Sequence, residues 1–364
     1  MAGAREYLSA DEAAAYLGVS RPTLYAYVSR GQIPSEPDPS AQSRARRYPR
    51  AALDELRSRR ERRRNPELRA HGALRHGPPV FDSALTLIAS GRLWYRGRDA
   101  CVLSRSATFE QVASLLWTGS AEQASDLFGR PGRAGAGDGR GSLVDRLVAA
   151  LVAARRDAPV TLAEPAPPAL RAAGRLVARL FGAAGATGPG TLAERLARGW
   201  RAPSAADLNA ALVLCADHEL NASAFTARCV ASTDAPVANA VLAALCALEG
   251  RRHGGASERV EELLRAAERD GPRRAWERAL STDGWIPGLD HRLYPGGDPR
   301  AAELLTRLEL PPGDPPAQLL ARAREELGVH PSLEFALGVL ARQARLPQGA
   351  SFALFALGRS AGWI

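Results

Sequence analysis

A chain of 364 residues with 46% hydrophobic content can bury a core and form two or three domains, which excludes a chain that is disordered throughout. All 48 basic residues are Arg, and they exceed the 39 acids by nine. Residues 1–70 carry fourteen Arg against nine acids, or +5 of that +9, so the charge predicts an anionic partner for the N-terminal region.

The first predicted elements are two short helices joined by a tight turn. Ser9 can cap the first helix, which ends before the turn residue Gly18. Ser20 can cap the second helix, which has Pro22 in its first turn and Gly31 as its stop. Six apolar residues have the spacing to pack the two helices together: Ala13, Tyr16, Leu17, Val19, Leu24 and Val28.

Four side chains should then lie on the outer face of this unit, and they suit a DNA groove: Arg21, Thr23, Tyr27 and Arg30. Residues 44–64 contain ten Arg and three acids. Residues 1–66 resemble the winged helix-turn-helix domain of MerR-like and excisionase-like proteins, in which an Arg-Tyr strand precedes a further helix. The resemblance implies DNA binding, with Arg46 and Arg47 on phosphates. The alternative is a module that docks on a protein partner and whose Arg run is a solvated helix face.

The segment 84–119 predicts a hairpin followed by a helix. It contains a G-x-L-x-Y-R-G-x-D core from Gly91 to Asp99 and an F-E-x-V-A-x-L-L-x-x-G helix from Phe109 to Gly119. Both features resemble citrate synthases. Ala/Leu/Arg patterns of 3.6-residue period follow, and no strand alternation of any length appears, so we expect an all-α body.

Three later segments place histidines where a small ligand could reach them. His218 lies between two acids, and His291 lies in a Pro/Gly-rich loop that leads to Arg300 at a helix start. His253 precedes two glycines and a helix. The positive end of that helix favours a neutral imidazole, and the glycines allow close backbone approach.

The order of these motifs resembles the citrate synthase family over roughly residues 75–364: D-H-x-L-N-A-S, H-G-G-A, P-G-x-x-H-x-x-Y-x-x-x-D-P-R-A and G-R-S-A-G-W. The resemblance implies an all-α citrate synthase fold behind the helix-turn-helix domain. Residues 72–256 plus 346–364 would form its large domain and residues 257–345 its small domain. It also implies a homodimer that binds oxaloacetate and acetyl-coenzyme A as substrates, with no cofactor and no metal.

The resemblance implies roles for single residues. His253 would donate to the thioester carbonyl of acetyl-coenzyme A, and His291 would polarise the ketone of oxaloacetate. Oxaloacetate would be held by His218, Asn221, His291, Arg300 and Arg359. The adenine of coenzyme A would lie along Ile286, Pro287, Gly288 and Leu289. Domain closure would exclude water from the reaction.

Two departures from the family pattern bear on activity. The family has an Asp base in a P-N-x-D-F segment, whereas HPSLEF offers Glu334, whose arm is one methylene longer. A base misplaced by about an ångström can lower a rate about a hundredfold. The family also continues past G-W-I to an Arg that enters the partner subunit's site, whereas this sequence stops at Ile364. Either the sequence was shortened, or another group, such as Arg292 or an Arg of the N-terminal half, holds that carboxylate.

Three functions remain open on this sequence. The first is condensation of acetyl-coenzyme A with oxaloacetate, with DNA-binding capacity added in front. The second is 2-methylcitrate synthesis from propionyl-coenzyme A, since one methylene gives weak discrimination. The third is a DNA-binding regulator whose citrate synthase fold senses a metabolite and has lost catalysis.

The remaining expectations concern the compartment. Cys101, Cys215, Cys229 and Cys246 form no CxxC pair, which predicts buried free thiols in a reducing compartment. The stretch Val237 to Leu248 is too short to span a bilayer, and the first residues have no apolar core of signal-peptide length. We therefore expect a cytoplasmic protein that does not enter a membrane.

Overall fold

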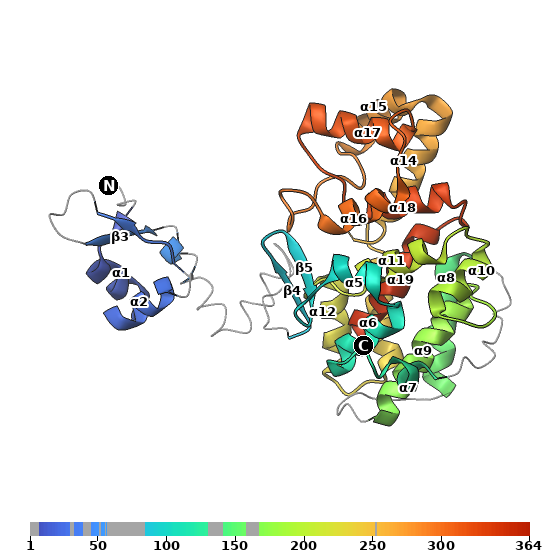
Figure 1. The fold of residues 1–364 in the computed structure, drawn as a ribbon, viewed down its shortest axis with the longest axis horizontal. Helices are drawn as coiled ribbons and strands as arrows, with labels where there is room; N and C mark the ends of the chain where they lie inside the picture. Colours follow the sequence, from blue (N-terminus) through green and yellow to red (C-terminus); the bar gives the residue numbers. More distant parts are fainter. Residues whose placement is uncertain are drawn as a thin grey trace. The chain divides into compact units, whose positions relative to one another are not determined.

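The structure is a computed structural model that describes residues 7–29, 33–38, 45–50, 52–54, 56, 84–129, 141–157, 167–251 and 253–364. The chain divides into two compact units, Met1–Val80 and Phe81–Ile364, and each is described by itself (Figure 1). The predicted stop at Gly31 and the predicted boundary at residues 65–66 lie outside the described residues. No helix in the described ranges is long and apolar enough to cross a membrane.

Within the described residues, the first unit contains helices α1 and α2, further helical residues at 52–54, and a small antiparallel sheet. Its elements are β1 Tyr7–Leu8, α1 Ala10–Leu17, α2 Arg21–Ser29, β2 Glu36–Pro37 and β3 Arg46–Pro49, with strand order β1-β3-β2. The predicted cap at Ser9 is confirmed, because its Oγ accepts from the Glu12 N–H at 3.3 Å while the Glu12 carboxylate accepts from the Ser9 N–H at 2.8 Å. Gly18 ends α1 with φ +62°, as a left-handed turn requires.

A small hydrophobic core holds these elements together. Its composition shows that one prediction was wrong. Leu24, Ile33, Tyr48 and Leu53 are almost fully buried in it with residues of α1. Tyr27 is half-buried and packs against this core, so its predicted position on the outer face is wrong. The neighbouring ring of Tyr25 is exposed instead.

The second unit begins with a three-stranded antiparallel sheet of order β4-β5-β6, formed by Thr86–Ala89, Arg92–Tyr95 and Arg98–Asp99. The rest of the unit is helical in the described ranges, as predicted. The helices are α5 Ala100–Ser106, α6 Phe109–Thr118, α7 Ala124–Phe128, α8 Leu143–Asp157, α9 Pro167–Ala183, α10 Leu192–Trp200, α11 Ala205–Cys215, α12 Ala222–Ala231, α13 Val237–Leu248, α14 Ala256–Asp270, α15 Pro272–Asp283, α16 Pro299–Leu308, α17 Pro315–Arg322, the π-helix η1 Ala323–Leu327, α18 Leu333–Gln343 and α19 Ala350–Trp363.

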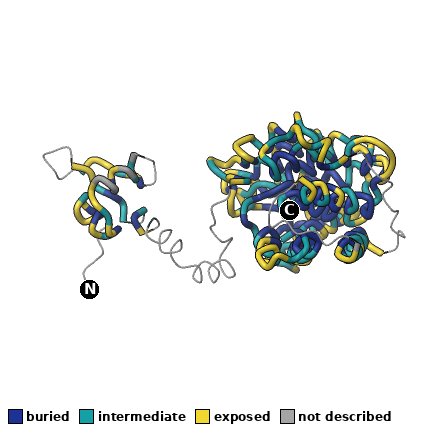
Figure 2. The backbone as a smooth tube through the Cα atoms, turned by 90° about the horizontal axis from the view of Figure 1, so that it is seen from below, coloured by how far each residue is buried: buried dark blue, intermediate teal, exposed yellow. Residues whose placement is uncertain are grey.

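The larger core of this unit surrounds α19, which is buried over nearly its whole length. Figure 2 shows the dark blue, buried parts of the chain concentrated in the interior of this unit. Helix α19 crosses α11 closely because Gly358 has no side chain. A Cβ at that position would lie 2.6 Å from the carbonyl oxygen of Leu212. This crossing brings the last helix against the segment that leads to His218.

A second, smaller core lies under α14, α15 and α17, the three helices at the top of Figure 1. Helix α18 serves both cores: Leu337 and Leu340 enter the larger one, while Phe335 and Val339 enter the smaller one. Helix α16 packs into the larger core through Leu304. The stretch 257–345 therefore contributes to both cores.

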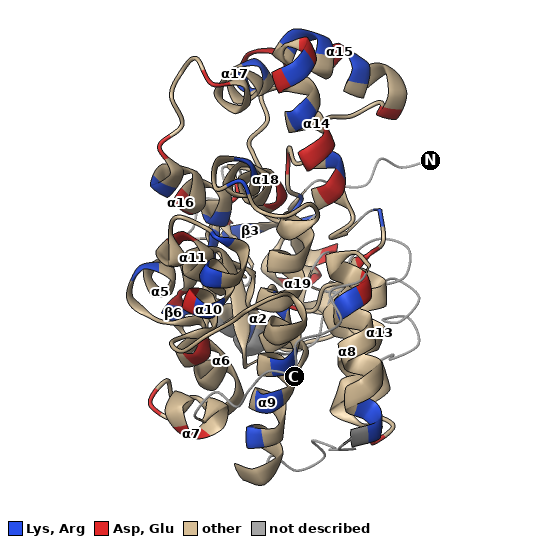
Figure 3. Ribbon diagram, turned by 90° about the vertical axis from the view of Figure 1, so that its right-hand side faces the viewer, with Lys and Arg blue, Asp and Glu red and all other residues tan. Residues whose placement is uncertain are grey.

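Helices α14 and α15 carry charged residues of both signs (Figure 3). Several are paired, such as Arg273 with Glu277 at 2.9 Å and Arg278 with Asp270 at 2.9 Å. These pairs are exposed and contribute little to stability, but they mark the solvent side of the helices.

The prediction that all four thiols are buried is wrong for two of them. Cys215 is buried and Cys101 is half-buried, but Cys229 and Cys246 are exposed. Spacing and neighbouring residues alone did not reveal which face of α12 and α13 each thiol occupies. All four cysteines are free.

Candidate active site

The loop between α11 and α12 presents His218 to the interior. Its ring is buried, and Nε2 lies 3.0 Å from the phenol oxygen of Tyr294. Burial lowers the pKa of His218 well below its ordinary value, and the charges of Arg300 and Arg359 lower it further. The imidazole is therefore neutral at pH 7.

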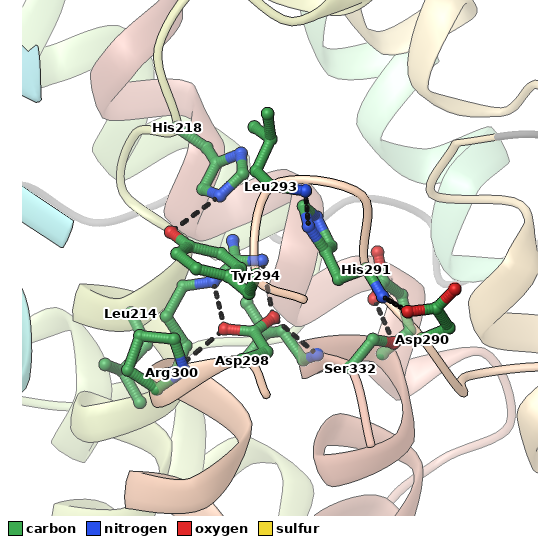
Figure 4. Close-up of polar contacts among 12 residues, drawn as sticks. Leu214, His218, Asp290, His291, Leu293, Tyr294, Asp298, Arg300 and Ser332 are labelled. Carbon is green, nitrogen blue, oxygen red and sulfur yellow. Dashed lines mark hydrogen bonds and ion pairs between the residues drawn. The ribbon is translucent and has the colours of Figure 1, made fainter. Parts of the chain in front are cut away.

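His291 lies against this pair, in the loop between α15 and α16 (Figure 4). Its ring centroid is 5.2 Å from that of His218 and 5.0 Å from that of Tyr294. Nδ1 of His291 accepts from the backbone N–H of Leu293 at 3.3 Å. The proton of the neutral ring then resides on Nε2, which is left as a donor. Burial, followed by the charge of Arg300, lowers the pKa of His291.

Arg300 supplies a buried cation at the start of α16. Its Nε and Nη2 donate to the two carboxylate oxygens of Asp298 at 2.9 and 2.7 Å. Burial opposes the charge on Arg300, but the ion pair outweighs burial and raises its pKa. Asp298 also accepts from the Leu333 N–H at 3.1 Å, so one carboxylate fixes the Arg and the beginning of α18 together.

Arg359 supplies a second buried cation from α19. Its Nε donates to the carbonyl oxygen of Cys215 at 2.7 Å, and its guanidinium lies 4.9 Å from the centroid of the Phe355 ring. Burial lowers the pKa of Arg359, and the nearby charge of Asp217 opposes that change. Two buried guanidinium groups, of which one is ion-paired with Asp298, form an environment suited to a dianion.

His253 lies in the turn between α13 and α14. Burial, followed by the charge of Arg359, lowers its pKa to about 3. This supports the expected neutral imidazole, and burial is the largest cause of the shift. Gly254 and Gly255 do permit a close approach, but to the end of α13. A Cβ on Gly255 would lie 2.5 Å from the carbonyl oxygen of Glu249.

One hydroxyl links His253 to two other elements. The Oγ of Ser223 lies 2.9 Å from Nε2 of His253 and 2.8 Å from Oδ1 of Asn221, and it accepts from Nε1 of Trp363 at 3.1 Å. The hydroxyl has a single proton. The 2.8 Å bond to Oδ1 of Asn221 uses that proton, because an amide oxygen only accepts, so Nε2 of His253 donates to the hydroxyl and Nδ1 is left as an acceptor. For Nδ1 to become a donor, the hydroxyl would have to turn from Asn221 to Nε2 of His253.

Asn221 has a local structural role. Its Oδ1 caps α12 by accepting from the N–H groups of Ser223 and Ala224, each at 3.1 Å. The predicted site residue therefore orients Ser223, and through it His253.

Glu334 lies in the first turn of α18. Its Oε2 accepts from the Ser332 hydroxyl at 2.6 Å, and the amino end of the helix favours its negative charge. Among the described residues, Glu334 makes no hydrogen bond to either His253 or His291. Its charge nevertheless raises the pKa of His291 against the larger effects of burial and Arg300. Glu334 thus belongs to the surroundings of the His291–Arg300 group.

The segment predicted to lie along coenzyme A is mostly internal. Ile286 and Leu289 are buried in the smaller core, and the carbonyl of Gly288 accepts from the Ser332 N–H at 2.8 Å. A Cβ on Gly288, at φ +77°, would lie 2.6 Å from the side chain of Val260. The smaller core takes up the side chains of Ile286 and Leu289, so only the backbone of 286–289 is left to lie along coenzyme A, and that role stays a prediction. Trp285, one residue earlier, is 40% exposed.

Sequence reasoning did not assign roles to four residues of the site: Ser223, Tyr294, Asp298 and Trp363. Each lies inside a quoted motif, so the signal was present. Their roles depend on which elements meet in space, which a motif does not specify.

The residues predicted to face DNA belong to the first unit. Arg21 is exposed and pairs with Asp11. Arg46 donates to the Oγ of Ser35 at 2.7 Å, and Arg47 pairs with Glu36 at 3.1 Å while lying 4.1 Å from the centroid of the Tyr7 ring. The predicted Arg-Tyr strand is confirmed as β3. Arg30 and the side chain of Thr23 lie outside the described residues.

A model of the citrate synthase C-terminal domain matches residues 140–364, more than half of the sequence. The chain belongs to the citrate synthase family. A helix-turn-helix domain model matches residues 7–61, so the family fold carries an N-terminal helix-turn-helix domain.

Relatives agree with this assignment. The chain is 32% identical over 169 residues to 2-methylcitrate synthase 2 of Corynebacterium glutamicum, covering 43% of each chain. It is 44% identical over 97 residues to citrate synthase 2 of Bacillus subtilis, covering 26% of each. The matches thus span less than half the length of these relatives.

A solved structure of the family shares the fold. The citrate synthase of Thermoplasma acidophilum, in a ternary complex with carboxymethyl coenzyme A and oxaloacetate, aligns with a TM-score of 0.64 at 21% identity. The alignment covers 78% of this chain and 88% of that one. At that identity the likeness establishes the citrate synthase fold alone.

Proposed function

We propose that this member of the citrate synthase family condenses acetyl-coenzyme A with oxaloacetate to give citrate and coenzyme A. The observation that carries the proposal is the group formed by His218, His291 and Tyr294 beside the buried cation of Arg300. Neutral imidazoles next to fixed cations suit a small dianion that carries a ketone. The Thermoplasma enzyme, whose structure contains oxaloacetate and a coenzyme A analogue, has the same fold.

Oxaloacetate would be bound by charge and oriented by hydrogen bonds. Arg300 and Arg359 would hold its carboxylates, with His218 and Asn221 beside them. Nε2–H of His291 would donate to the ketone oxygen and stabilise the negative charge that develops there when carbon attacks. Asp298 would keep the Arg300 guanidinium in one orientation.

Proton transfer would fall to His253 and Glu334. Glu334 would remove a proton from the methyl group of acetyl-coenzyme A, and His253 would donate to the thioester oxygen as the enol forms. This assignment requires the Ser223 hydroxyl to donate to Nε2 of His253 instead of to Oδ1 of Asn221, so that Nδ1–H of the neutral ring is the donor. The new carbon–carbon bond gives citryl-coenzyme A, which water hydrolyses to citrate and coenzyme A.

Domain motion would protect this chemistry. We infer that residues 257–345 close as a small domain over a large domain of residues 72–256 plus 346–364 and exclude water from the enol. The smaller hydrophobic core supports such a division, because it is formed wholly by residues of 257–345, while α16 and α18 connect that stretch to the larger core. No cofactor or metal has a role in this scheme. Coenzyme A would reach the site along the backbone of residues 286–289.

We also propose a cytoplasmic homodimer. Val148 on α8 and Leu242 on α13 pack against the larger core but remain partly exposed. A second copy of the chain would cover the exposed part of these side chains. Light scattering on the purified protein would test this: a mass of one chain at micromolar concentration would contradict it.

A thiol-release assay tests the proposed reaction. Purified protein is mixed with oxaloacetate and either acetyl- or propionyl-coenzyme A, and free thiol is measured over time. Turnover that falls at least about a hundredfold in Glu334→Gln and in His253→Ala supports the synthase. A faster rate with propionyl-coenzyme A would make the protein a 2-methylcitrate synthase, the name that the Corynebacterium relative carries.

The second candidate is a metabolite-sensing DNA-binding regulator. Two observations favour it: the helix-turn-helix domain, and a Glu334 carboxylate that bonds to Ser332 rather than to either imidazole. Tight oxaloacetate binding without thiol release, together with specific DNA retention that responds to oxaloacetate, would establish the regulator. DNA binding that does not change when oxaloacetate is added would contradict the regulator. The N-terminal domain would then be a DNA-binding module without metabolite control.

A further inference from the structure

The backbone next to His218 has an unusual conformation. Glu219 has φ +50°, in the left-handed region that side chains with a Cβ adopt only at a cost in free energy. Such a conformation persists where surrounding contacts impose it, often beside functional groups. Here it turns the chain so that the ring of His218 meets Tyr294 and His291.

The side chain of Glu219 is held by the β4–β5 hairpin. Its Oε1 accepts from the backbone N–H of Ile88 at 2.8 Å. Strand β4 is the edge of its sheet, so this N–H is not used by a neighbouring strand. A carboxylate on a backbone N–H forms a charge-assisted bond, which is stronger than a neutral one.

The same hairpin holds the residue on the other side of His218. Thr86 donates to a carboxylate oxygen of the buried Asp217. The phenol oxygen of Tyr95 lies 3.1 Å from the carbonyl oxygen of Asp217 and 3.3 Å from its amide nitrogen. His218 is thus bracketed by two residues that are both fixed to strands β4 and β5.

We propose that Glu219 is a positioning residue. Its carboxylate, bound to the Ile88 N–H, imposes the left-handed turn that presents His218 to His291 and thereby sets the affinity of the site for oxaloacetate. The statement about affinity rests on the proposed function, whereas the statement about the position of His218 does not. Glu219 itself does not touch the substrate.

Three substitutions separate the parts of this role. Glu219→Gln keeps an acceptor oxygen for the Ile88 N–H. Glu219→Ala removes the acceptor and leaves an unfavourable φ. Glu219→Gly removes the acceptor, but glycine tolerates the left-handed backbone. It should therefore unfold at a higher temperature than Glu219→Ala. If the Ala variant fails to fold, the Gly variant is used for the test. Glu262→Ala, an exposed acid on α14, controls for the loss of one negative charge.

The first readout needs no ligand. The chain has six histidines, so the ring ¹⁵N signals of histidine-labelled protein are few, and that of His218 is assigned as the one lost in His218→Gln. We expect the His218 signal to move in Glu219→Ala and Glu219→Gly, and to stay in Glu219→Gln and Glu262→Ala. An unmoved signal in both the Ala and Gly variants would overturn the proposal.

The second readout is substrate affinity. We expect Glu219→Ala and Glu219→Gly to raise KM for oxaloacetate about tenfold, with KM for acetyl-coenzyme A and kcat within about twofold of wild type. Glu219→Gln should restore the oxaloacetate KM. If the wild type releases no thiol, the synthase proposal fails, but calorimetry with oxaloacetate and the His218 signal still decide the role of Glu219. Equal losses in the Gln and Ala variants would overturn the role given to the hydrogen bond with the Ile88 N–H.

Discussion

Several imidazoles of this protein are buried near cations. The free energy of unfolding at acid pH therefore depends on individual histidines. The pKa of His253 falls from 6.5 in the unfolded chain to about 3 in the folded one. Between these values the unfolded chain binds more protons than the folded chain, so the free energy of unfolding decreases as pH falls. His218 and His291 have pKa shifts of the same sign.

Replacing His253 with Gln should therefore flatten the pH dependence of stability. In the wild type this single group contributes up to about 1.4 kcal/mol per pH unit between roughly pH 3 and 6.5. Urea unfolding midpoints at pH 4.5, 5.5 and 6.5 would measure the difference between the two proteins. Parallel curves would show that His253 is protonated in the folded state as readily as in the unfolded state.

Ser223 holds three partners with one hydroxyl, and its removal should affect both stability and rate. Ser223→Ala leaves Nε1 of the buried Trp363 without an acceptor, which costs about 1–3 kcal/mol. It also releases His253 from a fixed tautomer, so kcat should fall about tenfold. Ser232→Ala, at the exposed end of the same helix, is the matched control. A wild-type kcat in Ser223→Ala would contradict the donor assignment for Nδ1.

At the level of elements, the site depends on how closely α19 approaches α11. A methyl group at Gly358 would meet the carbonyl oxygen of Leu212 and the Cβ of Cys215, each at 2.6 Å. Backbone cannot yield as a flexible side chain does, so the helices must separate. Arg359 would then lose its place on the Cys215 carbonyl.

We expect Gly358→Ala to destabilise the protein by about 1–3 kcal/mol and to weaken oxaloacetate binding as well. Denaturant unfolding and calorimetry measure the two effects. Gly313→Ala is the control, because a Cβ there meets nothing within 4 Å and its φ is not positive. An unchanged unfolding midpoint in Gly358→Ala would mean that α11 and α19 separate without cost.

The elements also show what a sequence can and cannot predict. The cap at Ser9, the hairpin before α5 and the helical body follow from local signals, and the structure contains them. The mistaken assignments concern direction: Tyr27 packs inward and Cys229 faces solvent. The sequence also did not show that the side chains of Ile286 and Leu289 fill the smaller core. Which face of a segment is covered depends on distant partners, such as Val260 against Gly288.

For the candidate site, the motifs predicted which residues take part but not how they are connected. His218, His291 and Arg300 form one group with Tyr294, as their shared motif order indicated. The link from Asn221 through Ser223 to His253 could not be predicted, because it joins α12, the turn before α14 and the last turn of α19.

At the level of the whole molecule, the N-terminal unit should bind DNA largely through charge. If Arg46 and Arg47 contact phosphates, replacing both with Ala should reduce the slope of log affinity against log salt by about 2. Both side chains are now held within the unit, by Ser35 and Glu36, and would have to exchange those partners. Binding of the full chain to duplex DNA at several salt concentrations measures the slope. Arg98→Ala, in the second unit, is the control, and an equal slope in all three proteins would remove these residues from the interface.

The place of α19 has a consequence for biosynthesis. Residues 350–363 follow every other element described, yet they supply Arg359 and the Trp363 contact to Ser223. A nascent chain whose α19 is still inside the ribosome has Arg300 but lacks this second cation. A dianion bound as proposed would therefore meet its complete site only after α19 has packed. Such a ligand would stabilise the folded chain by about 2.7 kcal/mol at a hundred times its dissociation constant.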